Sequence, residues 1–196
     1  MKSLVLLRHA ESLWNRENRY TGWSDVPLTE KGRREAQEAG SILRKHDFHF
    51  DVAFTSVLDR ATSTLDIVLE TIGARRIPVL GSLALCERHY GALEGLSKAE
   101  TVATYGAEQV RAWRRSYDVR PPALAEDDER YVSMRKNPRY QSHSVVPRTE
   151  SLKDAMERLM PYWESVILPS LADSSQVLIV AHGNNIRGLV KHMEGM

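Results

Sequence analysis

The sequence contains one cysteine, Cys86, among its 196 residues, so no disulfide can form within the chain. Such scarcity fits a reducing compartment, and we expect a cytoplasmic protein. Apolar runs are also short, because none approaches the ~20 residues that a transmembrane helix requires. The first residues, Met1 to Ser3, lead into a strand pattern and not into a signal peptide. These absences predict a soluble chain without disulfides or membrane spans.

The sequence also lacks an excess of charge of either sign. The formal net charge is +1. This value argues against a protein that binds nucleic acids or membrane surfaces, because such proteins usually show a marked basic excess. The seven histidines include no His-x-x-x-His pair and have no cysteine partners, so we expect no metal. Walker A and Gly-x-Gly-x-x-Gly motifs do not occur, which argues against nucleotide ligands. A polyanionic ligand would therefore need cations that are concentrated locally.

Two apolar stretches that lie far apart in the sequence each end in a histidine. Residues 4–7 precede Arg8 and His9, and residues 177–181 precede His182. Unbroken apolar runs favour strands that are buried in a parallel sheet, whose carboxyl ends meet at the ligand-binding edge. If the two strands are neighbours, both imidazoles lie in one crevice. One ring can then attack phosphorus, while the other ring and the arginine stabilise charge on the transferring group.

Strand and helix patterns alternate along much of the remaining chain. In order, we expect an ordered loop over 10–28, a helix from the Thr29 cap to about Lys45, a strand over 51–56, a helix ending at Gly73, and a strand over 77–80. Later we expect helices over 98–105 and up to Arg115, an irregular excursion over 117–149, a helix from Ser151 that Pro161 interrupts, and a last helix from about Asn185. The alternation predicts a single α/β domain over 1–196 with a mostly parallel sheet, and an insertion at about 87–150 that covers the site.

Several motifs carry a resemblance to a known family. The segments Arg8-His9-Ala10-Glu11-Ser12 and His182-Gly183 resemble the histidine phosphatase superfamily. Further segments resemble the cofactor-dependent phosphoglycerate mutases: residues 11–15, 17–23, 87–91, 98–101 and 113–115. The resemblance extends from Leu4 to Gly195 and implies a three-layer, phosphoglycerate mutase-like fold. It also implies a glycolytic and gluconeogenic isomerase that interconverts 3-phosphoglycerate and 2-phosphoglycerate, with 2,3-bisphosphoglycerate as primer of a phosphohistidine.

The same resemblance assigns roles to individual residues. His9 is the expected nucleophile, and Arg8, Arg60 and His182 complete its phosphate pocket. Glu87 is the expected general acid and base, because the reacting hydroxyl must gain or lose a proton. Further expected substrate contacts are cations, neutral donors and points of close backbone approach: Ser12, Asn15, Thr21, Gly22, Arg88, His89, Tyr90, Lys98, Arg114, Arg115, Gly183 and Asn184. From spacing alone, the arginines are better explained as solvated surface residues, and only the resemblance favours a binding role.

Other functions remain open at this point. The alternatives are a histidine-type phosphatase, a bisphosphoglycerate synthase, or a catalytically silent protein that binds phosphorylated metabolites. The complete 87–115 segment favours the mutase, because a simple phosphatase needs no second anion site. Ser12 favours the mutase over the synthase, which has glycine there. The expected ligands are small phosphorylated three-carbon acids, and the sequence does not decide between a homodimer and a homotetramer.

Three features depart from the family pattern. Ala10 replaces a usual glycine, which matters little if the backbone φ angle there is negative. Cys86 replaces a usual asparagine, so we expect a looser Glu87. The sequence stops at Met196 where relatives continue, so the family's C-terminal tail is expected to be missing. Either a tail follows that this sequence omits, or the molecule is short; if it is short, we expect a more open site and a higher ratio of phosphatase to mutase activity.

Overall fold

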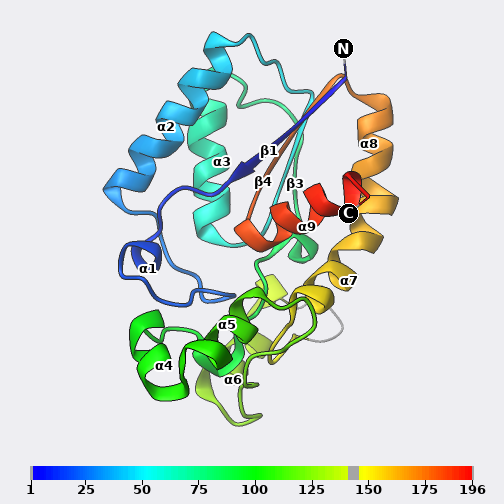
Figure 1. Cartoon of the computed structure of the whole chain (residues 1–196). Coiled ribbons are helices and arrows are strands. Elements are labelled where there is room, and N and C mark those ends of the chain that lie inside the picture. Colours follow the sequence, from blue (N-terminus) through cyan, green and yellow to red (C-terminus); the bar gives the residue numbers. More distant parts are fainter. Residues whose placement is uncertain (1, 141–145, 196) are drawn as a thin grey trace.

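A four-stranded parallel sheet forms the centre of the computed structural model, which describes residues 2–140 and 146–195 (Figure 1). Its strands are β1 (Ser3–Arg8), β2 (Val52–Thr55), β3 (Val79–Gly81) and β4 (Gln176–Ala181). The strand order is β1-β4-β2-β3, so the first and last strands of the chain are neighbours. This arrangement confirms the predicted α/β class and the parallel sheet.

The pairing of β1 with β4 determines where His9 and His182 lie. The two strands run in register from Ser3 opposite Gln176 to Arg8 opposite Ala181. The backbone N–H of His9 also donates to the carbonyl of Ala181, at 2.9 Å. Both histidines therefore leave the sheet at the same edge, as the repeated pattern predicted. β1 is only half-buried, however, because it is an edge strand, whereas β4 is buried along most of its length.

Helices cover both faces of the sheet and complete three layers (Figure 1). The helices on one side are α2 (Glu30–Lys45) and α3 (Asp59–Ile72), and those on the other are α7 (Leu152–Tyr162), α8 (Leu168–Asp173) and α9 (Gly183–Met193). Because successive side chains of a strand point to opposite faces of the sheet, the residues of β4 are divided between two core clusters. Leu178 and Val180 pack toward α2 and α3, while Val177 and Ile179 pack toward α7 and α9.

Local signals in the sequence set several helix ends. Thr29 caps α2 by accepting the N–H of Gly32 at its Oγ1, 2.9 Å away. Gly73 ends α3 with a φ of 76°, a left-handed conformation that glycine adopts without steric cost. Pro161 lies inside α7, which continues into a π-helical turn over Trp163–Ile167, so the predicted interruption is confirmed.

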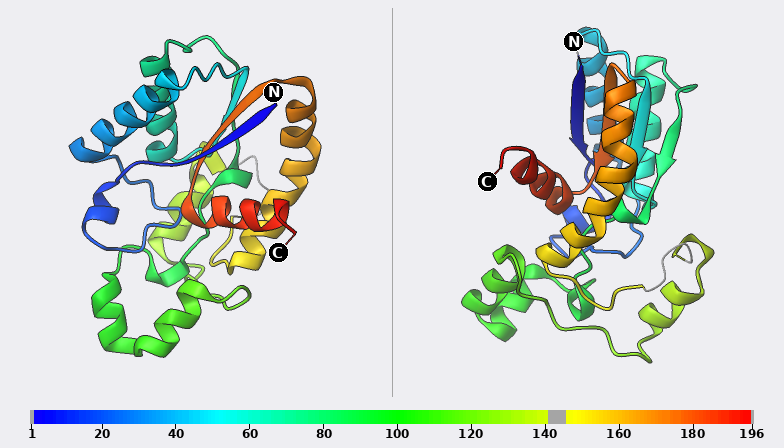
Figure 2. Two further views of the ribbon diagram at one scale, coloured as in Figure 1. Left: turned by 45° about the horizontal axis from the view of Figure 1, so that its top comes forward. Right: turned by 90° about the vertical axis from the view of Figure 1, so that its right-hand side faces the viewer.

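The segment after β3 gathers beyond the carboxyl ends of the strands (Figure 2). It contains α4 (Lys98–Tyr105), α5 (Ala107–Arg115) and α6 (Glu129–Lys136). The expectation of an entirely irregular stretch over 117–149 was wrong. Asp128 caps α6 by accepting the N–H of Arg130, and Tyr131 of α6 packs in a buried cluster with Trp23 and Tyr140. Tertiary packing thus stabilises a helix whose sequence pattern is weak.

Smaller differences concern element boundaries. The loop over 10–28 contains a short helix, α1 (Leu13–Arg16). β3 begins at Val79, two residues later than expected, and α9 begins at Gly183, two residues earlier. The early start of α9 matters for function, because it places a helix N-terminus directly after His182.

Candidate active site

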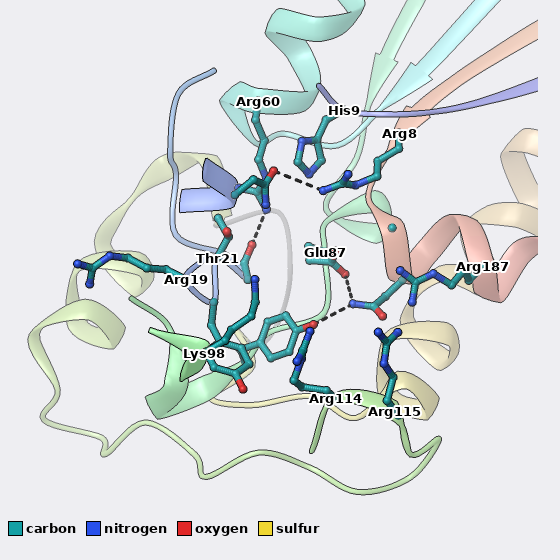
Figure 3. A pocket seen from close by; sticks show the side chains of 16 residues that line it. Arg8, His9, Arg19, Thr21, Arg60, Glu87, Lys98, Arg114, Arg115 and Arg187 are labelled. Atoms are coloured by element: carbon teal, nitrogen blue, oxygen red, sulfur yellow. Dashed lines mark hydrogen bonds between the residues drawn. The ribbon is translucent and has the colours of Figure 1, made fainter. Parts of the chain in front are cut away.

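A pocket of about 320 Å³ opens at the carboxyl edge of the sheet, between the strand ends and helices α4 and α5 (Figure 3). Its lining residues come from widely separated parts of the chain: Arg8, His9, Asn15, Arg19, Tyr20, Thr21, Gly22, Arg60, Glu87, Tyr90, Lys98, Arg114, Arg115, Gly183, Asn184 and Arg187. Seven of these side chains are cationic and one is a carboxylate. Such a lining suits a ligand with several negative charges.

The ring of His9 has the orientation that the predicted role as nucleophile requires. The Nδ1 of its ring lies 2.8 Å from the carbonyl oxygen of Ala10, which can only accept, so Nδ1 carries the proton. The other nitrogen, Nε2, then keeps its lone pair. Burial, together with the positive charges of Arg60 and Arg8, holds the pKa of His9 well below its usual value. The ring is therefore neutral near pH 7, the form that attacks phosphorus.

The backbone at Ala10 supports this geometry. Among the described non-glycine residues, only Asn18 and Asp47 have positive φ angles, so alanine is accommodated at position 10 without strain. The N–H of Ala10 also donates to the hydroxyl of Thr64 at 3.1 Å. The replacement of the family's usual glycine is therefore as modest a change as expected.

His182 lies next to His9, with 5.0 Å between ring centroids, but it does not line the pocket. Its side chain is fully buried, and its Nε2 lies 2.7 Å from the hydroxyl of Ser56. Its Nδ1 has no hydrogen-bond partner among the described residues. Burial and the nearby charge of Arg60 hold the pKa of His182 well below its usual value. Contact between His182 and a transferring phosphoryl group remains a prediction.

Arg8 and Arg60 flank His9 at one end of the pocket (Figure 3). Arg60, on the first turn of α3, is buried and donates to the carbonyls of Gly22 and Ser24 at 2.6 and 3.0 Å. Its Nε has no partner within the described part of the chain. Arg8 is exposed and donates to the side-chain oxygen of Asn15 at 3.4 Å. The two guanidinium groups can thus bind the oxygens of a phosphoryl group on His9.

Glu87 lies between the two ends of the pocket. Its Oε1 accepts hydrogen bonds from the side-chain amide of Asn184 at 2.9 Å and from the backbone N–H of Arg88 at 2.8 Å. The same amide of Asn184 also donates to the hydroxyl of Tyr90, at 3.2 Å. The carboxylate is therefore oriented toward the cavity that His9 also faces, as general acid–base catalysis requires.

The far end of the pocket is built from α4 and α5. Lys98, Arg114 and Arg115 point into it opposite His9 (Figure 3). None of the three forms a salt bridge among residues 2–140 and 146–195. Burial and the charges of Arg114 and Arg8 lower the pKa of Lys98. These unneutralised charges favour the binding of an anion.

The sequence prediction and the structure differ on several pocket residues. Arg19, Tyr20 and Arg187 line the pocket but were not predicted, although Arg187 follows His182 on the first turns of α9. The Arg19 side chain is held away from the cavity by Glu17 at 2.9 Å and by the Gly95 carbonyl at 2.7 Å. In contrast, Arg187 lies near Arg8 on the pocket wall, and both side chains approach Gly183. A Cβ added to Gly183 would be 3.5 Å from Nη2 of Arg187 and 3.6 Å from Nε of Arg8.

Three residues that were predicted to contact substrate are buried outside the pocket lining, namely Ser12, Arg88 and His89. Arg88 stacks over the ring of Tyr90, with 4.6 Å between its Cζ and the ring centroid. His89 packs against Trp23, at 5.8 Å between centroids, and its Nδ1 accepts the N–H of Gly91 at 2.9 Å. These side chains support the pocket wall in this structure, and direct contacts with substrate remain predictions.

The replacement of asparagine by Cys86 predicted a looser Glu87, and this stays a prediction. The carbonyl of Cys86 accepts hydrogen bonds from Asn185 at 2.9 Å and from Arg158 at 3.0 Å, so backbone contacts hold this segment. Burial raises the pKa of the Cys86 thiol to about 11. The thiol is therefore protonated and unreactive near neutral pH.

Metal-binding clusters and membrane-spanning helices are both absent from the described residues. No group of three or more histidine, cysteine, aspartate or glutamate side chains is arranged to hold a metal ion in the described ranges. None of the helices there is long and apolar enough to cross a membrane.

Comparison with known proteins identifies the family. Residues 4–137 match the model of the histidine phosphatase superfamily, branch 1. The 2,3-bisphosphoglycerate-dependent phosphoglycerate mutase of Bacteroides fragilis is 53% identical, over 99% of this chain and 78% of the relative. The 2,3-bisphosphoglycerate-dependent phosphoglycerate mutase 2 of Bacteroides thetaiotaomicron is 55% identical, with the same coverage.

Solved structures agree on the fold. YhfR of Bacillus stearothermophilus superimposes with a TM-score of 0.73 at 27% identity, covering 100% of this chain and 81% of that one. A phosphoglycerate mutase from Bacillus anthracis gives a TM-score of 0.70 at 23% identity, covering 98% and 79%. The match to the family model and the identity to the two Bacteroides enzymes show that the chain belongs to the 2,3-bisphosphoglycerate-dependent phosphoglycerate mutases of the histidine phosphatase superfamily.

Proposed function

We propose that this protein interconverts 3-phosphoglycerate and 2-phosphoglycerate through a phosphohistidine at His9. The distribution of charge in the pocket is the main support for this proposal. Arg8 and Arg60 flank His9, and a second set of cations, Lys98, Arg114 and Arg115, lies at the opposite end. A ligand with a single phosphate needs only the first set. A phosphoglycerate carries both a phosphate and a carboxylate, so it makes use of both.

The proposed reaction divides one displacement into two. In the first step the Nε2 of His9 attacks the 3-phosphoryl phosphorus of 2,3-bisphosphoglycerate, the bond between phosphorus and the ester oxygen breaks, and protonated Glu87 gives its proton to the departing oxygen of 2-phosphoglycerate. In the second step the carboxylate of Glu87 takes the proton from the free hydroxyl of 3-phosphoglycerate, which attacks phospho-His9 and forms 2,3-bisphosphoglycerate again. The ring nitrogen regains its lone pair, so enzyme and charge return to the starting state.

The pocket also fits 2,3-bisphosphoglycerate as the primer that phosphorylates His9. Buried donors without partners in the described chain, including Thr21 Oγ1 and Arg60 Nε, are available to a ligand there. Lys98, Arg114 and Arg115 would bind the phosphate that does not react. His9 and Arg8 would at the same time hold the phosphate that is transferred.

The setting of the enzyme is part of the same proposal. Interconversion of phosphoglycerates is a step of glycolysis and gluconeogenesis, and we propose a cytoplasmic location. A homodimer or a homotetramer is compatible with it. Light scattering of the purified protein distinguishes these states from each other and from a monomer.

Phosphorus NMR tests the activity directly. Starting from 3-phosphoglycerate, we expect the 2-phosphoglycerate resonance to appear rapidly only when a catalytic amount of 2,3-bisphosphoglycerate is present. Release of inorganic phosphate as the main reaction would instead identify a phosphatase. A change of His9→Ala should abolish both the turnover and the acid-labile phosphate seen by intact mass. Labelling that survives this change would contradict the nucleophile assignment.

Bisphosphoglycerate synthesis is the second function that the NMR experiment can detect. Ser12 favours the mutase, although its hydroxyl is buried and has no partner among the described residues. With 1,3-bisphosphoglycerate as the donor, we therefore expect net synthesis of 2,3-bisphosphoglycerate to be slower than mutase turnover. A dominant synthase rate would reverse this assignment.

A further inference from the structure

Arg158 of α7 is a buried arginine that does not line the pocket and has no part in the chemistry above. Its Nη1 donates to the carbonyls of Leu83 and Ala84 at 2.6 and 2.9 Å. Its Nη2 lies 3.0 and 3.3 Å from the carbonyls of Cys86 and Glu87. All four acceptors belong to the short segment that ends at Glu87. One rigid guanidinium group therefore determines where this backbone segment lies.

Glu150 completes the contact on the other side of Glu87. Its Oε1 accepts a hydrogen bond from Nε of Arg158 at 2.8 Å, and its Oε2 accepts one from Nη2 at 3.0 Å. This two-point ion pair is almost fully buried. The same Oε2 accepts the backbone N–H of His89 at 2.9 Å. Because a buried charge without a partner is costly, the pair keeps its geometry, and it holds the backbone both before and after Glu87.

Trp23 provides a third restraint, from a separate loop. Its indole Nε1 donates to the carbonyl of Glu87 at 2.6 Å. The guanidinium carbon of Arg158 lies 5.2 Å from the centre of the Trp23 ring, within the range of a cation–π interaction. Trp23 and Arg158 thus restrain the same carbonyl and also support each other.

The backbone of Glu87 in turn orients its carboxylate. One donor to Oε1 is the N–H of the next residue, Arg88, and the other is Asn184. A shift of the backbone therefore moves the acid relative to His9 and the departing oxygen. We infer that Arg158, together with Glu150 and Trp23, is the positioning residue that aims Glu87 for proton transfer; this inference rests on the proposed function.

A positioning role makes a distinct prediction about leaving groups. Phosphorylation of His9 by 2,3-bisphosphoglycerate expels an alkoxide, which needs the proton of Glu87. The acyl phosphate of 1,3-bisphosphoglycerate expels a carboxylate, which leaves without one. Both donors carry two phosphates on three carbons, but only 2,3-bisphosphoglycerate also has a free carboxylate, so each variant is compared with the wild type on the same donor at saturation. A misplaced Glu87 should therefore slow the phosphorylation of His9 by 2,3-bisphosphoglycerate but not by 1,3-bisphosphoglycerate.

The experiment measures phosphorylation of His9 in single turnovers with each donor, by rapid quench and intact mass. Arg158→Lys keeps a charge beside Glu150 but removes the planar fork that reaches four carbonyls. Trp23→Phe keeps a ring but removes the bond to the carbonyl of Glu87. We expect both variants to react about 10- to 100-fold more slowly with 2,3-bisphosphoglycerate, and less than about 3-fold more slowly with the acyl phosphate.

Arg120→Gln is the matched control, because Arg120 also pairs with a carboxylate of α7, Asp154, at 2.6 Å, but at the surface. It should leave both donors unaffected. Glu87→Gln should show the largest selective loss. If Arg158→Lys does not fold, the milder Trp23→Phe decides the question.

Equal losses with both donors, or no loss with either, would overturn the positioning role while leaving the proposed function intact. A wild-type protein that neither donor phosphorylates would overturn the proposed function and this inference with it. The two failures are therefore distinguishable.

Discussion

Replacement of Gly22 by alanine should be costly for both stability and catalysis. Gly22 lies in the pocket wall with a φ of 55°, and an added Cβ would come within 1.8 Å of Glu94 Oε1. Glu94 cannot easily move away. It is 4% exposed, and its carboxylate accepts the N–H groups of Trp23 and Tyr90, each at 3.0 Å, and both the N–H and the hydroxyl of Ser24, at 3.1 and 2.9 Å.

The magnitude has two parts, and a second glycine separates them. A left-handed conformation costs a non-glycine residue roughly 1–2 kcal/mol. Displacing a buried carboxylate from its donors adds roughly 1.5–3 kcal/mol. Gly73 has a φ of 76° and nothing within 4 Å of an added Cβ, so Gly73→Ala measures the first part alone. We expect Gly22→Ala to lower the free energy of unfolding by about 2.5–5 kcal/mol, against about 1–2 kcal/mol for Gly73→Ala.

Urea denaturation of the two variants and the wild type measures these energies. Turnover should respond as well, because the carbonyl of Gly22 accepts Nη2 of Arg60 at 2.6 Å. We expect kcat to fall by about 10- to 100-fold in Gly22→Ala, since a small shift would misplace the phosphoryl ligand. In Gly73→Ala it should be unchanged. If both variants lose the same stability, Glu94 is not held as firmly as these contacts imply, and the reasoning fails.

Two further predictions concern the charges of the pocket. Arg187→Gln should raise KM for 3-phosphoglycerate by about 10-fold or more with little change in kcat, because a charge-assisted hydrogen bond contributes roughly 1.5–3 kcal/mol to binding. Arg33→Gln, on an exposed face of α2, is the control, and a selective fall in kcat would contradict a binding role. His9 and His182 have pKa values well below 6.5 in the fold, so below that pH the unfolded chain binds protons that the native state does not. The free energy of unfolding should therefore fall on acidification from pH 6.5, by up to about 1.4 kcal/mol per pH unit for each histidine. His9→Gln should show a shallower fall between pH 7.5 and 5.5 in urea titrations, and parallel curves would refute the buried neutral state.

Local patterns in the sequence were sufficient for most of the fold. The apolar runs before His9 and His182, the Thr29 cap and the glycine at position 73 all act within a few residues, and each was confirmed. Because strand ends converge at one edge of a parallel sheet, the sequence also predicted that the two histidines would meet if their strands were neighbours, and the pairing of β1 with β4 supplies that condition. The weakly patterned helix α6 was missed, since packing against Trp23 and Tyr140 stabilises it.

Only the tertiary structure decided which side chains face the ligand and which support the site from behind. Arg88 and His89 belong to the same motif as Glu87, yet they are buried and outside the pocket lining, whereas Arg187 faces it without a motif that marked it. The contacts of Arg158 span more than seventy residues of sequence. The sequence determined the chemical groups and the local elements, because those depend on near neighbours. Burial, orientation and partners arise only when distant segments pack together, and no local pattern encodes them.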